Sequence, residues 1–120
     1  MAENIIISKS KKFAIRIIRL YQYLSDVKKE FVLSKQLLRS GTSIGANVRE
    51  AHNSQSKKEF ISKMNIALKE AAESEYWLEL LFDTDYLSED EFLSIIADCN
   101  ELNRILISII KKSNTNKQPK

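Results

Sequence analysis

The sequence predicts an all-α protein that folds as an antiparallel, up-down-up-down four-helix bundle. Two Gly and one Pro among 120 residues are too few turn residues for a β-rich domain. Four segments carry apolar residues at helical spacing. The connections between them are short, which makes consecutive helices antiparallel neighbours. We therefore expect one bundle domain over residues 1–112 and a flexible polar tail over residues 113–120.

Apolar spacing and helix-start motifs set the limits of three of the helices. The first is expected over residues 8–27, the third over 56–83 and the fourth over 88–112. The third and fourth each begin with a capping box, in which a Ser side chain accepts from the N3 amide and a Glu reaches back to the cap amide. These boxes pair Ser56 with Glu59 and Ser88 with Glu91, and Leu87 and Phe92 add a hydrophobic staple to the second.

The second helix is expected over residues 34–52 and contains two internal glycines. Ser34 is placed to cap its start. Gly41 and Gly45 lie inside it, and each mid-helix Gly costs about 1 kcal/mol relative to Ala. Their spacing of four residues puts both on one face, where they would let another backbone approach. We therefore favour a continuous, closely packed helix over a break near residues 39–43.

The chain lacks the residue sets that common catalytic and metal sites need. A hydrolytic triad needs a base beside a nucleophile. The single His, His52, is expected at a helix end, and the single Cys, Cys99, on an apolar face where it packs as a core residue. No Glu is followed three residues later by His, as di-iron bundles require. No Gly-rich phosphate loop occurs. We expect no enzyme, no metal, no cofactor and no small-molecule substrate.

The cysteine count and the hydropathy pattern indicate a cytoplasmic protein. One Cys cannot form a disulfide within the chain, which suits a reducing compartment. No apolar run approaches the length of about 18 residues that a membrane span requires. The apolar residues 5–7 are too few, and wrongly flanked, for a signal peptide. We expect no membrane contact.

Charge is strongly segregated along the chain although the formal net value is only +3. Lys and Arg exceed Asp and Glu by eight in residues 1–58, fall short by ten in residues 59–101 and exceed them by five in residues 102–120. A bundle built from such segments carries basic and acidic surfaces on one molecule. This polarity suits an anionic partner or association between copies of the chain, and the plain alternative is solvated helix faces.

Seven basic residues are candidates for contacts with nucleic-acid phosphates. They are Lys11, Lys12, Arg16, Arg19, Arg49, Lys57 and Lys58. No helix-turn-helix, zinc or RNP-type motif accompanies them, and aromatic residues are not interleaved with them as stacking platforms. The pattern is shared by many basic surfaces, so it identifies neither a target RNA nor a partner.

A polar stripe on the second helix is predicted to pair with the third helix. The stripe consists of Arg39, Ser43, Asn47 and Glu50, and the third helix offers Glu70 and Glu73 opposite. A hairpin that turns near residue 54 sets Arg39 level with Glu70. We expect a partly buried ion pair of Arg39 with Glu70 or Glu73, which costs about 3–5 kcal/mol to break if it is buried. A device for helix register is favoured here over a ligand site.

The second and third helices carry motifs of a known family. They read LRSGTSIGANVREA over residues 38–51, SKKEF over 56–60, IALKEA over 66–71 and EYWLELL over 75–81. In these motifs, and over about residues 10–112, the chain resembles the bacterial four-helix-bundle proteins related to the 23S rRNA intervening-sequence protein. A minor departure is Ala51, where the family often has Gly.

The resemblance implies an assembly and a function as well as a fold. Members are up-down bundles, commonly assembled as homopentameric rings, and some are encoded within insertions in large-subunit rRNA genes. A relative, the accessory variability determinant of diversity-generating retroelements, is a basic pentamer that binds nucleic acid and a reverse transcriptase. We accordingly expect a non-enzymatic homo-oligomer, a homopentamer by resemblance, that binds RNA or an RNA–protein complex. The alternative is a structural or protein-interaction module without nucleic-acid binding.

Overall fold

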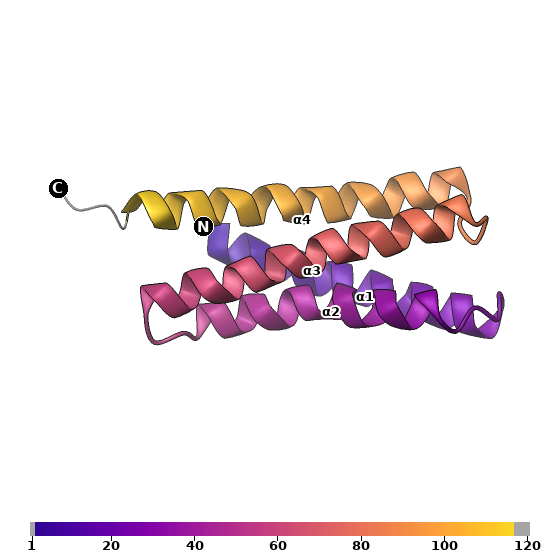
Figure 1. Ribbon diagram of the computed structural model, residues 1–120, viewed down its shortest axis with the longest axis horizontal. Helices are drawn as coiled ribbons and strands as arrows, with labels where there is room; N and C mark the ends of the chain where they lie inside the picture. The colour runs from indigo at the N-terminus through magenta and orange to yellow at the C-terminus, as the bar shows by residue number, and fades with distance from the viewer. Residues whose placement is uncertain (1, 117–120) are drawn as a thin grey trace.

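The computed structural model describes residues 2–116 as four helices, which confirms the predicted all-α four-helix bundle. They are α1 (Ala2–Asp26), α2 (Leu33–His52), α3 (Lys57–Asp83) and α4 (Glu89–Asn116). Successive helices run in opposite directions, and α1 also packs against α4, which closes the bundle (Figure 1). The α1–α2 and α3–α4 turns lie at one end, and the α2–α3 turn lies at the other end together with the end of α4.

Two helix ends lie beyond their predicted positions. α1 begins at Ala2 rather than at residue 8, and the added turn buries Ile6 completely in the core. α4 continues to Asn116 rather than ending at residue 112, since residues 113–116 contain no Gly or Pro to stop it. The first half of the predicted polar tail is therefore helical, and residues 117–120 lie outside the described residues.

The core runs along the bundle and takes apolar residues from all four helices. It includes Ile6, Phe13, Ile17 and Leu24 of α1, Leu37, Ile44 and Val48 of α2, Met64, Leu78 and Leu81 of α3, and Leu102 and Leu106 of α4. Near the α3–α4 turn the rings of Phe82 and Phe92 stack with centroids 4.5 Å apart. Of the predicted staple residues, Leu87 belongs to this core and Phe92 is partly buried against it.

The predicted capping box forms in full at the start of α4, and the serine cap of the other predicted box forms at the start of α3. The Ser56 Oγ accepts from the Glu59 amide at 3.1 Å, and the Ser88 Oγ accepts from the Glu91 amide at 3.1 Å. The Glu91 carboxylate accepts in return from the Ser88 amide at 2.8 Å. At α3 the return bond is shifted by one residue, because the Glu59 carboxylate accepts from the Gln55 amide at 3.0 Å. Local sequence thus sets both helix starts.

The start of α2 corrects one prediction, because Glu30 rather than Ser34 caps the helix. The Glu30 carboxylate accepts from the backbone amides of Val32 at 3.1 Å, Leu33 at 2.9 Å and Ser34 at 2.7 Å. Ser34 lies inside the first turn, fully buried, and its hydroxyl donates to the Glu30 carbonyl at 2.7 Å. One carboxylate therefore satisfies three of the donors that a helix start leaves free.

The environment of Glu30 favours its charged form although the residue is only 8% exposed. Burial by itself raises the pKa of the carboxyl, but the backbone amides outweigh burial and hold the pKa below its usual value. The preceding residue, Lys29, adopts the left-handed conformation at φ 58° and reverses the chain. This cap is not predictable from composition, because Glu is not among the preferred N-cap residues.

α2 is continuous through both glycines, as predicted, and they face α1. A Cβ atom at Gly41 would lie 2.8 Å from the Cγ1 atom of Ile17, closer than side chains pack. A Cβ atom at Gly45 would lie 3.4 Å from the Ser10 Oγ, which is an ordinary contact. Gly41 therefore lets Ile17 lie directly against the backbone of α2, whereas the packing at Gly45 has room for a methyl group.

A buried hydrogen bond sets the register of α2 against α3. The Ser40 and Ser74 hydroxyl oxygens lie 2.8 Å apart, and both side chains are fully buried. Along the same seam, Lys63 forms an ion pair with Glu50 at 2.8 Å. In each pair, the point midway in sequence between the two partners falls about three residues beyond residue 54, where the turn was expected. The predicted register is therefore wrong, and Arg39 lies level with residues 74–75 rather than with Glu70.

Candidate nucleic-acid interface

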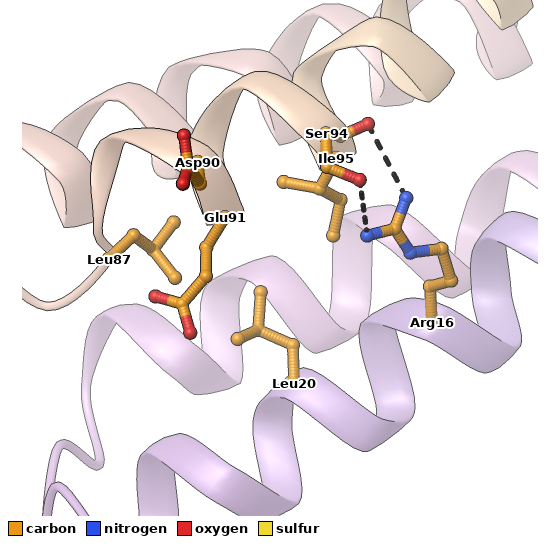
Figure 2. Close-up of a pocket in the computed structure, with 7 residues that line it drawn as sticks. All are labelled: Arg16, Leu20, Leu87, Asp90, Glu91, Ser94 and Ile95. Atoms are coloured by element: carbon orange, nitrogen blue, oxygen red, sulfur yellow. Dashed lines mark hydrogen bonds between the residues drawn. The ribbon is translucent and has the colours of Figure 1, made fainter.

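Cations of α1 that face α4 are neutralised within the chain. The Arg16 guanidinium forms an ion pair with Asp98 at 2.7 Å. It also donates to the Ser94 Oγ at 3.1 Å and the Ser94 carbonyl at 3.4 Å, as Figure 2 shows. Lys9 pairs with Glu101 at 3.1 Å. The four charged side chains are 40–45% exposed, so each pair contributes only ~0–1 kcal/mol. Arg16, which was predicted to contact phosphates, therefore binds α4 instead.

A cavity of about 360 Å³ opens on the same seam. Its lining comprises Arg16, Leu20, Leu87, Asp90, Glu91, Ser94 and Ile95. Figure 2 shows Leu20 and Ile95 between the Arg16 guanidinium on one side and the Glu91 carboxylate on the other. The two carboxylates of the wall repel phosphates, and the cation is already paired. This cavity does not suit a nucleic acid.

The other three basic candidates of α1 are exposed but do not form a cluster. Lys12 lines a small cavity of about 80 Å³ together with Asp98 and Glu101, so it faces carboxylates. Lys11 and Arg19 are exposed, and no ion pair within residues 2–116 engages them. They are eight residues apart, which is roughly 12 Å along a helix. α1 thus offers two isolated cations to a partner.

The remaining three candidates lie together where α2 turns into α3. Arg49 is in the last turn of α2, and Lys57 and Lys58 form the first turn of α3. All three are exposed. None of them takes part in an ion pair in the described part of the chain. The structure therefore places these three candidates at the same end of the bundle, away from Arg16.

The last turns of α4 lie at the same end of the bundle, an arrangement that the sequence candidates did not include. Ser113 and Lys57 line one cavity of about 430 Å³, so the exposed Lys111 and Lys112 lie at the same end of the bundle (Figure 1). The rest of its lining is Ala51, His52, Ser54, Gln55, Ser56 and Phe60. We use the name basic end for Arg49, Lys57, Lys58, Lys111 and Lys112. The up-down topology could have predicted this placement, because it brings the end of α4 to the same end of the bundle as the α2–α3 turn.

The polar stripe of α2 is satisfied mostly within its own helix. The Ser43 Oγ donates to the Arg39 carbonyl at 2.7 Å, and the Asn47 Nδ2 donates to the Ser43 carbonyl at 2.9 Å. Glu50 is the stripe residue that reaches α3 in a described ion pair, with Lys63. Arg39 is exposed and closes no ion pair among residues 2–116. The predicted pairing of Arg39 is therefore wrong, because α3 is displaced from the expected register.

Glu70, one of the two expected partners of Arg39, is affected most by its own burial and by its neighbour Glu73. Burial raises the pKa of the Glu70 carboxyl, and the charge of Glu73 raises it further, while the more distant Arg39 charge lowers it. Arg39 thus influences Glu70 through space without a direct contact. The α2–α3 register depends on the buried Ser40 and Ser74 and not on this group.

The one cysteine is a core residue, as predicted, and the one histidine lies on the surface. Cys99 is fully buried, and its Sγ donates to the Ala71 carbonyl at 3.4 Å. Burial, with smaller effects of the Glu75 and Asp98 charges, raises the pKa of the thiol to about 12. His52 is exposed in the last turn of α2. Cys99 is therefore no nucleophile at neutral pH.

Residues 2–116 contain neither a metal-binding group nor a membrane-spanning helix. No group of three His, Cys, Asp or Glu side chains there is arranged to hold a metal ion. No helix there has the length and apolar character to cross a membrane. The site that remains is the basic end with its cavity.

The fold and the site define an all-α helical bundle with a cluster of exposed cations at one end. The chain matches the family model of the 23S rRNA-intervening sequence protein over residues 2–108, so it belongs to this family, as the resemblance predicted. A solved structure of a protein with unknown function from the S23 ribosomal protein family of Bacteroides thetaiotaomicron VPI-5482 is similar, with 58% sequence identity and a TM-score of 0.92. That match covers 92% of this chain and 99% of the other. No curated protein matches the chain.

Proposed function

We propose that the protein is a non-enzymatic, cytoplasmic homo-oligomer that binds RNA, alone or within an RNA–protein complex, through its basic end. The observation that carries this proposal is a contrast between two groups of cations. Arg16 and Lys9 of α1 are paired with carboxylates of α4. The five cations of the basic end are exposed and form no ion pair among residues 2–116. Exposed cations of this kind bind nucleic-acid phosphates favourably, because the binding releases counterions from the nucleic acid.

Exposed apolar side chains on two helices support the homo-oligomer. On α1, Ile15 and Ile18 are each 40% exposed. On α4, Leu93 is 55% exposed and Ile107 is 44% exposed. α1 and α2 carry more cations than carboxylates, whereas α3 and α4 carry more carboxylates than cations. A basic, partly apolar face that meets an acidic one on the next copy is a heterologous contact, which can close into a ring. The homopentamer that the family resemblance implies is such a ring.

RNA binding is tested by removing charge at the basic end. The test variant replaces Arg49, Lys57 and Lys58 with Gln. A control variant makes the same change in net charge at the other end of the bundle, by replacing Lys28, Lys29 and Lys35 with Gln. We expect the test variant to lose roughly tenfold or more in affinity at low salt, and its log K to fall less steeply with log salt, by about two to three units of slope.

The control variant distinguishes a local effect at the basic end from a general effect of net charge. It should keep most of the affinity, because only its general charge changes. Both variants should keep their helical circular dichroism and melting temperature. Equal losses in the two variants would contradict a localised site. A natural chain that binds no RNA even at low salt would contradict the proposal itself.

Light scattering tests the assembly separately. We expect a particle near five times the 13.9 kDa mass of one chain. Ile18→Glu, which adds a charge to an exposed apolar position of α1, should release smaller species without unfolding the bundle. A natural chain that is a monomer at all concentrations would contradict the homo-oligomer.

The alternative, a protein-interaction module that binds no nucleic acid, is favoured by a different surface. At the α1–α2 turn, Val27 is 63% exposed, Phe31 52% and Val32 71%. Contiguous exposed apolar residues of this kind mark protein contacts. An oligomer that fails to bind RNA at low salt, and that loses a protein partner on Phe31→Ser, would support this alternative.

A further inference from the structure

We infer that the cavity at the basic end holds one unpaired nucleotide of a bound RNA, an inference that rests on the proposed RNA binding. The cavity measures about 430 Å³, within the ~300–1,000 Å³ range of sites for small ligands. Two of its lining residues are apolar: Ala51 is buried, and Phe60 is partly buried against the core. A partly exposed aromatic ring in the lining of a polar cavity offers a surface on which a nucleobase can stack.

The rim of the cavity supplies the polar groups that an unpaired base and its phosphate need. The exposed Gln55 side chain both donates and accepts, as does the Ser113 hydroxyl, which matches the mixed donors and acceptors of a base edge. The Ser54 hydroxyl already donates to the Ser56 carbonyl at 3.4 Å, so it offers a base its acceptor lone pairs. Lys57 adds a positive charge for the adjoining phosphate. The backbone amide of Gln55 is already bonded to the Glu59 carboxylate. Recognition therefore depends on side chains and not on the start of α3.

Only an unpaired base, outside an RNA duplex, can bind in this cavity. In a duplex the base faces are stacked and the Watson–Crick edges are paired, so neither is available to Phe60 or Gln55. The other cations of the basic end, by contrast, meet phosphates of any RNA. The cavity thus adds a preference for single strands to an affinity that charge alone would give equally to both.

The experiment compares three probes of about twelve nucleotides, bound to the full chain at one low salt concentration. They are a single-stranded RNA, the RNA duplex of the same sequence, and an abasic strand of the same length that keeps the phosphates and lacks the bases. We expect the single strand to bind at least about fivefold more tightly than the abasic strand, since stacking of one base on an aromatic ring is worth that factor or more. It should also bind more tightly than the duplex, although the duplex carries more charge.

Three variants locate the preference. Phe60→Leu removes the ring from the cavity, and Phe82→Leu removes a partly buried ring from the far end of α3 as a matched control. Gln55→Ala changes an exposed residue and carries no risk to folding. We expect Phe60→Leu and Gln55→Ala to lose the preference for the single strand while keeping the affinity for the duplex. Phe82→Leu should keep both.

The outcomes separate this inference from the proposed function. If the natural chain binds the single strand and the abasic strand equally, or if the preference survives in Gln55→Ala and in a folded Phe60→Leu, the cavity does not hold a nucleotide. RNA binding through the basic end would then still stand on the duplex measurement. If no probe binds at all, the proposed function fails, and this inference fails with it.

Discussion

Glu30 and Ser34 bond to each other twice at the start of α2. The Ser34 amide donates to the Glu30 carboxylate at 2.7 Å, and the Ser34 hydroxyl donates to the Glu30 carbonyl at 2.7 Å. Both residues are buried, so water does not readily replace either bond. One ionisable side chain therefore joins the turn after α1 to the first turn of α2.

Replacing that side chain should destabilise the bundle in a pH-dependent way. We expect Glu30→Gln to lower the free energy of unfolding by about 1–2 kcal/mol at pH 7, because the neutral amide is a weaker cap. The pKa of Glu30 is lower in the folded chain than in the unfolded chain. Its contribution is therefore complete above the unfolded value of about 4.3 and is lost as pH falls through the lower folded value.

Urea unfolding of the natural chain and of Glu30→Gln, between pH 7 and pH 2.5, measures this difference. The gap between the two midpoints should narrow on the acid side. An exposed carboxylate of α3, changed in the control variant Glu79→Gln, should move the midpoint little at any pH. A gap of constant size down to pH 2.5 would show that the charge of Glu30 does not act in the cap.

The two glycines of α2 should respond in opposite ways to a methyl group. Gly41→Ala places Cβ 2.8–3.2 Å from three atoms of Ile17, and such overpacking costs about 1–3 kcal/mol. Gly45→Ala meets nothing closer than 3.4 Å and should gain up to about 1 kcal/mol of helix propensity. Thermal unfolding of the two variants measures the contrast. Equal shifts of the melting temperature in the same direction would refute the close packing of Gly41.

Glu70 should be a mildly destabilising residue at neutral pH. Its pKa is raised by burial and by Glu73, so the folded chain holds its proton to a higher pH than the unfolded chain does. The cost is absent below the unfolded pKa and is complete above the folded one. Glu70→Gln should therefore stabilise the bundle at pH 7 by a few tenths of a kcal/mol, the scale of partly exposed charges, and should not stabilise it at pH 3. Loss of stability at pH 7 would reverse this assignment.

Cys99 should be unreactive while the bundle is folded. Burial keeps its thiol protonated, with a pKa of about 12, and closes access to reagents. A disulfide reagent at pH 8 should modify it only in denaturant. Ser62→Cys in a Cys99→Ala background places a thiol on the exposed surface of α3 and should react at once. Rapid modification of native Cys99 would mean that α3 and α4 separate readily.

The parts of the fold that depend on neighbouring residues were accessible from the sequence. The capping boxes at Ser56 and Ser88 lie within four-residue motifs, so the starts of α3 and α4 were predicted correctly. The cap of α2 was not, because it needs Lys29 in a left-handed conformation before Glu30 can reach the amides. A backbone conformation of that kind leaves no composition signal when the residue is not Gly.

The parts that depend on distant residues were predicted less well. Arg16 and Asp98 are 82 positions apart, and only their placement on facing helices shows that the arginine is committed to α4. The register of α2 and α3 follows from Ser40 and Ser74, whose small side chains give no periodic signal. Lys111 is absent from the predicted phosphate contacts, because its place at the end of the bundle with the α2–α3 turn follows from the full lengths of α3 and α4.

The four seams of the bundle are not equally strong, and this has a consequence for motion. The α2–α3 seam contains the dry Ser40–Ser74 bond, while the α1–α4 seam has two ion pairs open to solvent and cavities along its length. Transient opening should therefore start between α1 and α4, so that amide hydrogens of these terminal helices exchange with deuterium before those of the central hairpin. A ligand or a second copy that spans both terminal helices would slow that exchange and would thereby report its own binding.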